Sequence, residues 1–336
     1  MCEFLNNYDS FYNDVDDILY YYIYDDTTKS RAYVFSEYNS LFSDENNIIV
    51  GKCFYLNSPK IIIDEMDYKT KNISGERYIN MGYRKKGNDY VVNPDRSIQS
   101  FVLNNNLFSV AKSKSIFATN YSVFETKNIV GVSEPKKSLQ VLYKKNNYFR
   151  KIVNNITRNF RVNIDDLGLT GSLALGSKIG SDYDIVFYGD LSRINLIKEK
   201  IDYFIKKNGF VREYGVNWPC RYYDDDYNLI CCFFNCTDPI YVPHKDAQII
   251  KEDYGFKTRI IDDTFSLLKA PILKIDNSEI DNVLLLNSGL RGMLKKGDII
   301  SGVGKIIQYD MNKKTKYSIL CTNPYDEVKS NNDFIF

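Results

Sequence analysis

The sequence is poor in the residues that build histidine-based sites. His244 is the only histidine among 336 residues, so a histidine-based zinc centre or a Ser-His-Asp triad would depend on this one residue. None of the seven cysteines falls in the C-x-x-C spacing of zinc sites, and we expect reduced thiols that pack as small apolar side chains. A metal cluster around Cys231, Cys232 and Cys236 is the alternative.

Long apolar runs are also missing. No run approaches the roughly 20 residues of a membrane-spanning helix, and the first ten residues, "MCEFLNNYDS", lack the basic and apolar regions of a signal peptide. We therefore expect a cytoplasmic protein with no membrane partner.

The chain has almost no net charge (+1), so total charge excludes no class of partner. Its distribution is uneven: the first fifty residues carry ten acidic side chains against Lys29 and Arg31, whereas residues 291–316 carry seven basic side chains against two acidic ones. The basic segment could bind phosphate, including that of nucleic acid, or could attract the acidic end. Solvated surface charge is the simpler interpretation.

The pattern of elements divides the chain into three expected segments. Residues 1–130 are rich in aromatic and β-branched residues and predict a β-rich module, with strands such as "DILYYYIY" and "RAYVFSEY" around a polar turn. Residues 131–258 begin with a helical stripe that Asn146 and Asn147 can split, and continue as alternating strands and helices. Residues 259–336 show short strands with glycine turns, typical of a small β-barrel.

The strongest functional signal lies in "GSLALGSKIGSDYDIVFYG", residues 171–189. Asp182 and Asp184 open a predicted strand two positions apart, so both carboxylates face the same side. Two neighbouring carboxylates repel each other unless a cation such as Mg²⁺ or Mn²⁺ lies between them. Upstream, Gly171 and Ser172 stand where a strand turns into a short helix, a place where backbone N–H groups can meet phosphate.

This segment resembles the signature of the DNA polymerase β-type nucleotidyltransferase superfamily, in which Gly-Gly or Gly-Ser is followed about ten residues later by an acid-hydrophobic-acid-hydrophobic run. It is especially similar to predicted archaeal nucleotidyltransferases with an extra N-terminal domain. The resemblance implies that Gly171 and Ser172 hold a triphosphate and that Asp182 and Asp184 bind Mg²⁺. Lys178 in the spacer could contact phosphate, or could face solvent. The implied fold class is α+β, with a mixed-sheet nucleotidyltransferase core between the β-rich module and the barrel-like segment.

The resemblance also predicts a third acid from a later strand, for which "DDDYNLICCFF" is the candidate. Asn228 stands at the expected position, and an amide carries no negative charge and is no base. Asp226, two residues earlier on the same face, could replace it. Alternatively, Asp226 belongs to a solvated acidic loop at residues 224–226.

The sequence therefore predicts a Mg²⁺-dependent nucleotidyltransferase that moves a nucleoside monophosphate from an NTP to a hydroxyl group and releases pyrophosphate. The acceptor could be RNA, a protein or a small molecule. The alternative is a catalytically decayed protein on the same fold that binds nucleotide or nucleic acid. A two-metal nuclease is a weaker third reading, because it needs more acids than the motif offers.

Overall fold

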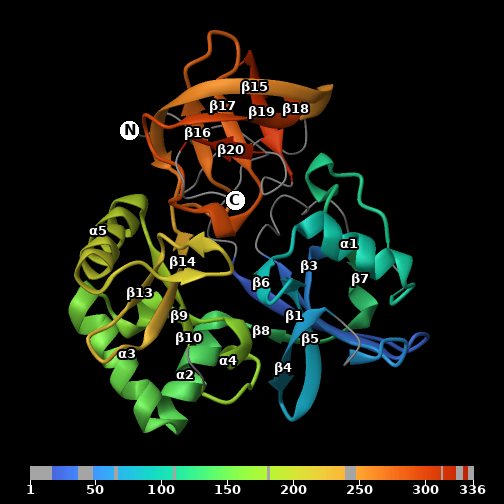
Figure 1. Cartoon of the computed structure of the whole chain (residues 1–336), viewed down its shortest axis with the longest axis vertical. Coiled ribbons are helices and arrows are strands. Elements are labelled where there is room, and N and C mark those ends of the chain that lie inside the picture. Colours follow the sequence, from blue (N-terminus) through green and yellow to red (C-terminus); the bar gives the residue numbers. More distant parts are fainter. Residues whose placement is uncertain are drawn as a thin grey trace.

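A computed structural model describes residues 17–36, 48–63, 67–108, 111–179, 182–238, 247–311, 313–322 and 328–331. His244 lies outside these ranges. The protein is a mixed α+β molecule in which sheet predominates, as the sequence predicts. Figure 1 shows three sheet-containing regions around a common centre: the N-terminal region, the central region with most of the helices, and the C-terminal region.

The N-terminal region is an eight-stranded antiparallel sheet in which β4-β5-β3-β2-β1-β8 are neighbours, β6 pairs with β5, and β7 pairs with β3. Aromatic and β-branched residues alternate along these strands and fill the sheet's two faces. The elements are β1 (Leu19–Asp25), β2 (Ser30–Ser36), β3 (Ile48–Asn57), β4 (Tyr68–Ile73), β5 (Glu76–Lys86), β6 (Asp89–Val92), α1 (Asp95–Asn104), η3 (Ile116–Ala118), β7 (Ser122–Glu125), η4 (Thr126–Asn128) and β8 (Ile129–Ser133).

The central region is a four-stranded mixed sheet in the order β13-β14-β10-β9, in which β10 and β14 run parallel. The helical stripe that follows β8 does split at Asn146, whose side chain caps the second helix by accepting from the Phe149 amide. The elements are α2 (Pro135–Lys145), α3 (Asn147–Phe160), η5 (Ile164–Asp166), β9 (Leu167–Leu169), α4 (Gly171–Ala174), β10 (Asp182–Gly189), α5 (Leu191–Asn208), β11 (Arg212–Glu213), β12 (Val216–Asn217), β13 (Arg221–Tyr223) and β14 (Leu229–Cys236).

The C-terminal region is a half-barrel sheet that supports the barrel-like segment expected from the sequence. Its pairings follow β15-β16-β17-β19-β18, and β15 also pairs with β18. The long strand β15 crosses the boundary expected at 258–259, because it already begins at residue 248. The elements are β15 (Gln248–Phe265), β16 (Ile272–Ile275), β17 (Asn282–Leu285), η6 (Ser288–Leu290), β18 (Ile299–Met311), β19 (Lys314–Cys321) and β20 (Val328–Ser330).

The two faces of the central sheet have different neighbours. On one face, Tyr183, Ile185 and Phe187 pack in one apolar core with α2, α3 and α5. On the other face, Val186 joins a core with Ile73 and other residues of the N-terminal sheet. The Ser74 amide also donates to the Gly176 carbonyl oxygen at 3.3 Å. The N-terminal sheet is therefore fixed over this second face, which is the face that carries the acid pair.

Candidate functional site

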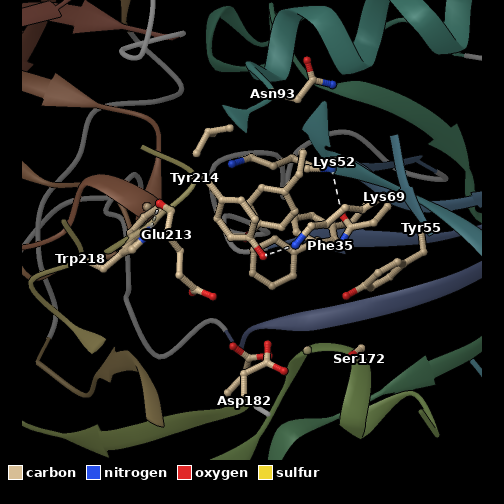
Figure 2. A pocket seen from close by; sticks show the side chains of 18 of the residues that line it. Phe35, Lys52, Tyr55, Lys69, Asn93, Ser172, Asp182, Glu213, Tyr214 and Trp218 are labelled. Carbon is tan, nitrogen blue, oxygen red and sulfur yellow. Dashed lines mark hydrogen bonds between the residues drawn. The ribbon is translucent and has the colours of Figure 1, made fainter. Parts of the chain in front are cut away.

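A cavity of about 630 Å³ lies where the three regions meet. The central region contributes Gly171, Ser172, Asp182 and Asp184 to its wall, so the structure brings together the four residues of the sequence motif. Figure 2 shows Asp182 and Ser172 on one side of this pocket, with Tyr55 and Phe35 of the N-terminal sheet opposite. The C-terminal region adds Asn287, Gly289 and Arg291.

Gly171 is required by the close approach of its backbone to the acid pair. Its φ is +69°, a conformation that side-chain-bearing residues rarely adopt. A Cβ atom at this position would lie 1.8 Å from Asp184 Oδ2. The Thr170 amide also donates to the Asp184 carbonyl oxygen at 2.9 Å, which ties this turn to β10. The single turn α4 therefore lies directly against the second carboxylate.

The acid pair carries the electrostatic signature of a cation site. Burial and, to a lesser extent, the neighbouring Asp182 carboxylate raise the pKa of the Asp184 carboxyl to about 7. Two carboxylates held this way favour a bound cation, and oxygen ligands of this kind suit Mg²⁺ or Mn²⁺. Asp182 and Asp184 could therefore hold a divalent cation.

Ser172 is held in the pocket wall by its neighbours. Its hydroxyl accepts from Ser177 Oγ at 3.2 Å. The Tyr55 hydroxyl also interacts with it, and burial raises the pKa of Tyr55 well above its ordinary value. Tyr55 therefore stays neutral beside Ser172. This contact joins the N-terminal sheet to the motif.

Three basic side chains from three regions surround the acid pair. Lys71 comes from β4, Arg221 from β13, and Arg291 from the segment after η6, and all three line the cavity. Their positive charges act on Asp184, since each lowers the pKa of this carboxyl against the effect of burial. A ligand with several negative charges would therefore meet cations as well as the acid pair.

Both arginines are fixed by aromatic rings. The Arg221 guanidinium lies 4.2 Å from the Trp218 ring, and its Nη1 donates to Glu213 Oε2 at 2.5 Å. The Arg291 guanidinium lies 4.2 Å from the Phe233 ring and donates from Nε and Nη2 to the Cys232 carbonyl oxygen at 3.0 and 2.6 Å. Neither guanidinium needs to reorganise much to meet an anion.

The pocket also has an aromatic wall, formed by Tyr83, Tyr214 and Phe233, which the sequence motif does not predict. The Tyr83 and Tyr214 rings stack with centroids 3.8 Å apart, and Lys69 Nζ donates to the Tyr214 hydroxyl at 2.9 Å. Tyr214 has a φ of +56° in the turn between β11 and β12, so this small hairpin presents it to the N-terminal sheet. The aromatic residues of the first segment, which on sequence alone predict only strands, include Tyr83 of this wall.

Strand β14 does not bring a third acid to the pair; of the other acids that line the cavity, Glu213 accepts from Arg221 and Asp95 pairs with Lys52. In the parallel register, Asp182 lies opposite Leu229 and Asp184 opposite Cys231, so β14 presents apolar and thiol side chains on the pocket face. Burial raises the pKa of the Cys231 thiol well above its ordinary value. Among the described residues, no group of three or more His, Cys, Asp and Glu side chains is placed to hold a metal ion.

Asn228 and Asp226 lie elsewhere. The Asn228 amide nitrogen donates to both carboxylate oxygens of Asp224, and its oxygen accepts from the Tyr148 hydroxyl of α3 at 2.8 Å. Asp226 is half exposed, with Oδ2 3.2 Å from Lys151 Nζ, also of α3. Asn228 and Asp226 precede β14, and both contact α3 and not the acid pair.

Lys178 is exposed and is not part of the pocket wall. The basic C-terminal segment is divided: Arg291 enters the pocket, while Lys305 pairs with Glu252 at 3.1 Å and Lys316 with Asp281 at 3.0 Å. Of the basic side chains expected to bind phosphate, Arg291 therefore lines the cavity, whereas Lys305 and Lys316 are paired with acids; phosphate binding by this segment stays a prediction.

Comparison of the chain with protein-family models, curated proteins and solved structures gives no match. The resemblance to nucleotidyltransferases thus rests on the sequence motif alone. None of the helices in the part of the chain that the structure describes combines the length and apolar character needed to cross a bilayer.

Proposed function

We propose that the protein is a divalent-cation-dependent nucleotidyltransferase that uses the pocket around Asp182 and Asp184. The observation that carries the proposal is the contact of Gly171 with Asp184: a glycine turn at φ +69° packs against a half-buried carboxylate pair, inside a cavity that is also lined by basic side chains. This arrangement offers a cation site and a polyphosphate site side by side.

Asp182 and Asp184 would hold the cation, which when bound neutralises phosphate charge and orients the nucleotide. Ser172 and the turn at Gly171 would bind phosphate oxygens. Lys71, Arg221 and Arg291 would neutralise the remaining charge. In the reaction, an acceptor hydroxyl oxygen attacks the α-phosphorus, the bond to the bridging β-phosphate oxygen breaks, pyrophosphate leaves, and the hydroxyl proton passes to water.

The aromatic wall supports a nucleotide as the ligand. Tyr83, Tyr214 and Phe233 line the same cavity as the acid pair, and aromatic side chains bind nucleobases by stacking. A volume of about 630 Å³ lies within the ordinary range of small-molecule pockets. An RNA or protein acceptor would have to insert a flexible end.

A label-transfer assay tests the proposal. The full chain is incubated with Mg²⁺ or Mn²⁺, each α-³²P-labelled NTP, and either total RNA, the protein fraction or the small-molecule filtrate of a lysate. We expect cation-dependent transfer of label to one fraction, lost in Asp182→Asn and Asp184→Asn. Asp225→Asn is the matched control, because Asp225 is an exposed acid paired with Lys207 outside the pocket. Transfer that persists in both pocket variants would exclude the assigned site.

A second candidate function is binding of a nucleotide–cation complex without transfer. It is favoured by the pocket face of β14, where Leu229 and Cys231 stand beside the acid pair and no carboxylate does. Equilibrium dialysis with Mg²⁺ and labelled NTP separates the candidates. Binding that needs Asp182 and Asp184, with no label transferred to any fraction, would support the second and contradict the first.

A further inference from the structure

All the charged side chains of helices α2 and α3 are basic. Residues 135–161 contain eight basic side chains and no acidic one, although the whole chain has a net charge of only +1. Seven of the eight are exposed, and Arg150 is half-buried. They are Lys136, Lys137, Lys144, Lys145, Arg150, Lys151, Arg158 and Arg161.

On α3 the polar residues form one continuous stripe. Six side chains line a shallow groove along this helix, at positions that follow the helical spacing of three and four residues: Asn147, Arg150, Lys151, Asn154, Asn155 and Arg158. The helix has 14 residues, so the stripe is about 20 Å long. It presents three cations and three amides.

The other side of α3 is fully used by the core. Phe149, Ile152, Val153, Ile156 and Phe160 are at most 8% exposed and pack against the central sheet. A basic amphipathic helix that lies on a membrane needs its apolar side free to enter the lipid. Here that side is buried, so the chemistry of the exposed stripe alone must select the partner.

The composition of the stripe differs from that of an ordinary solvated helix face. Such faces are stabilised by good helix formers and by Glu–Lys pairs one turn apart. Asn is a poor helix former in interior positions, yet Asn154 and Asn155 stand together in the middle of α3. α3 itself contains no glutamate or aspartate, although Asp226, from the loop before β14, pairs with its Lys151 at 3.2 Å. Asn154 has a structural partner, since it accepts from the Tyr143 hydroxyl of α2 at 2.9 Å, and Arg150 donates to the Tyr143 and Lys144 carbonyl oxygens. Helix stability does not explain Asn155.

We propose that the exposed stripe of α3, with Lys144 and Lys145 at the end of α2, binds nucleic acid. Lysine and arginine contact phosphate, and asparagine amides contact phosphate, sugar or base edges, so both residue types of the stripe have a partner in a polynucleotide. The exposed Tyr148 at the start of α3 adds an aromatic side chain for base contact.

This surface is separate from the pocket. On β10, Tyr183 and Phe187 point to α3, with the Phe149 and Tyr183 rings stacked at 6.1 Å and the Phe160 and Phe187 rings at 5.3 Å. The alternate residues Asp182 and Asp184 line the cavity on the opposite face. Nucleic acid bound on α3 would thus leave the pocket accessible, and the inference does not depend on the proposed transferase activity.

Fluorescence anisotropy of labelled 20-mers tests the charge contribution. We expect the full chain to bind at least one of single-stranded RNA, duplex RNA and duplex DNA, with affinity that falls steeply from 50 to 200 mM salt, a range set by counterion release. Lys145→Gln/Arg158→Gln should weaken binding at least about tenfold and lower the duplex salt slope by about 1.8. Lys200→Gln/Lys206→Gln on α5 removes the same charge elsewhere and should have little effect.

An asparagine pair tests the stripe itself. Asn155→Ala removes a groove residue, whereas Asn159→Ala changes the same residue type on the same helix outside the groove. Both variants should unfold at the same or a higher temperature than the parent, since alanine is the better helix former. Only Asn155→Ala should weaken nucleic-acid binding, by about tenfold.

Three outcomes would overturn the proposal. The first is absence of salt-dependent binding to all three nucleic acids at 50 mM salt. The second is equal weakening by the α3 and α5 double variants, which would assign binding to overall charge. The third is binding to phosphatidylserine vesicles that depends on Lys145 and Arg158 while nucleic-acid binding does not.

Discussion

The two faces of strand β10 differ in the polarity of their side chains and in what they pack against. Asp182 and Asp184 alternate with Tyr183, Ile185 and Phe187, so one face carries carboxylates and the other carries a dense apolar core. The pocket face meets the aromatic wall of the N-terminal sheet, and the core face meets α3 and α5. One strand therefore separates a polar cavity from the packing that holds it in place.

Along β10, ligand binding and fold stability thus depend on alternate residues. Changes on the pocket face should alter ligand binding and leave folding mostly intact. Changes on the core face should do the reverse.

The largest expected effect comes from Gly171→Ala. The new Cβ would meet Asp184 Oδ2, and the φ of +69° would strain the backbone. The turn or the carboxylate must move, and a misplacement of about 1 Å costs on the order of 100-fold in function. We expect this loss in cation-dependent NTP binding, measured by equilibrium dialysis. Gly209→Ala is the control, because its φ is +88° but no atom lies within 4 Å of the added Cβ. Equal losses in both variants would mean that backbone strain alone is responsible.

On the core face, Phe187→Ala should destabilise the fold. Phe187 is fully buried between Phe160 and Phe234. Loss of a buried phenylalanine side chain costs about 3–5 kcal/mol in the free energy of unfolding, measurable by urea titration. The protein that remains folded should bind NTP with the affinity of the parent. Weaker binding without a change in unfolding would reverse the proposed division of β10.

Part of this division was predictable from the sequence. The acid pair with Gly171 and Ser172 was found because local spacing determines it: two residues along a strand share a face, and a glycine marks the turn. The α+β class and the split of the helix at Asn146 also followed from local patterns. These features are determined by residues that are close together in the sequence.

The rest depended on contacts between distant segments. Lys71, Tyr83 and Arg291 join the pocket from strands and loops that no local pattern links to the motif. Which side chains of β14 lie on the pocket face depends on the register of its pairing with β10. A shift of one residue in this register turns every side chain to the other face, and the sequence does not give the register. That is why Asp226 and Asn228 were expected at the acid pair and lie on the α3 side.

Cation affinity should depend on pH, because the pKa of the Asp184 carboxyl is raised. In the absence of a cation the pKa of Asp184 is raised to about 7, so below this pH a proton competes with the cation. Apparent Mg²⁺ or Mn²⁺ affinity should rise by up to about tenfold per pH unit between pH 5 and 7 and level off above. The pKa of Asp184 is higher in the folded, cation-free protein than in the unfolded chain. The free energy of unfolding of the cation-free protein should therefore increase as pH falls from 7 towards 4.

Thermal unfolding between pH 5 and 8, with and without the cation, measures both effects. Stabilisation by the cation should increase with pH up to about 7, and Asp184→Asn should remove most of this dependence. A cation effect that is constant over the whole range would argue against Asp184 as a ligand.

The smallest effect is expected for Asp226→Asn. The Asp226 carboxylate is half exposed and pairs with Lys151 across the surface, on the side of the sheet away from the acid pair. Exposed ion pairs contribute less than about 1 kcal/mol, so the midpoint of urea unfolding should hardly move. Label transfer and NTP binding should stay within about twofold of the parent, as is usual for surface substitutions. A loss of transfer as large as that of Asp182→Asn would show instead that Asp226 reaches the acid pair during the reaction, and that the two faces of this sheet are not functionally separate.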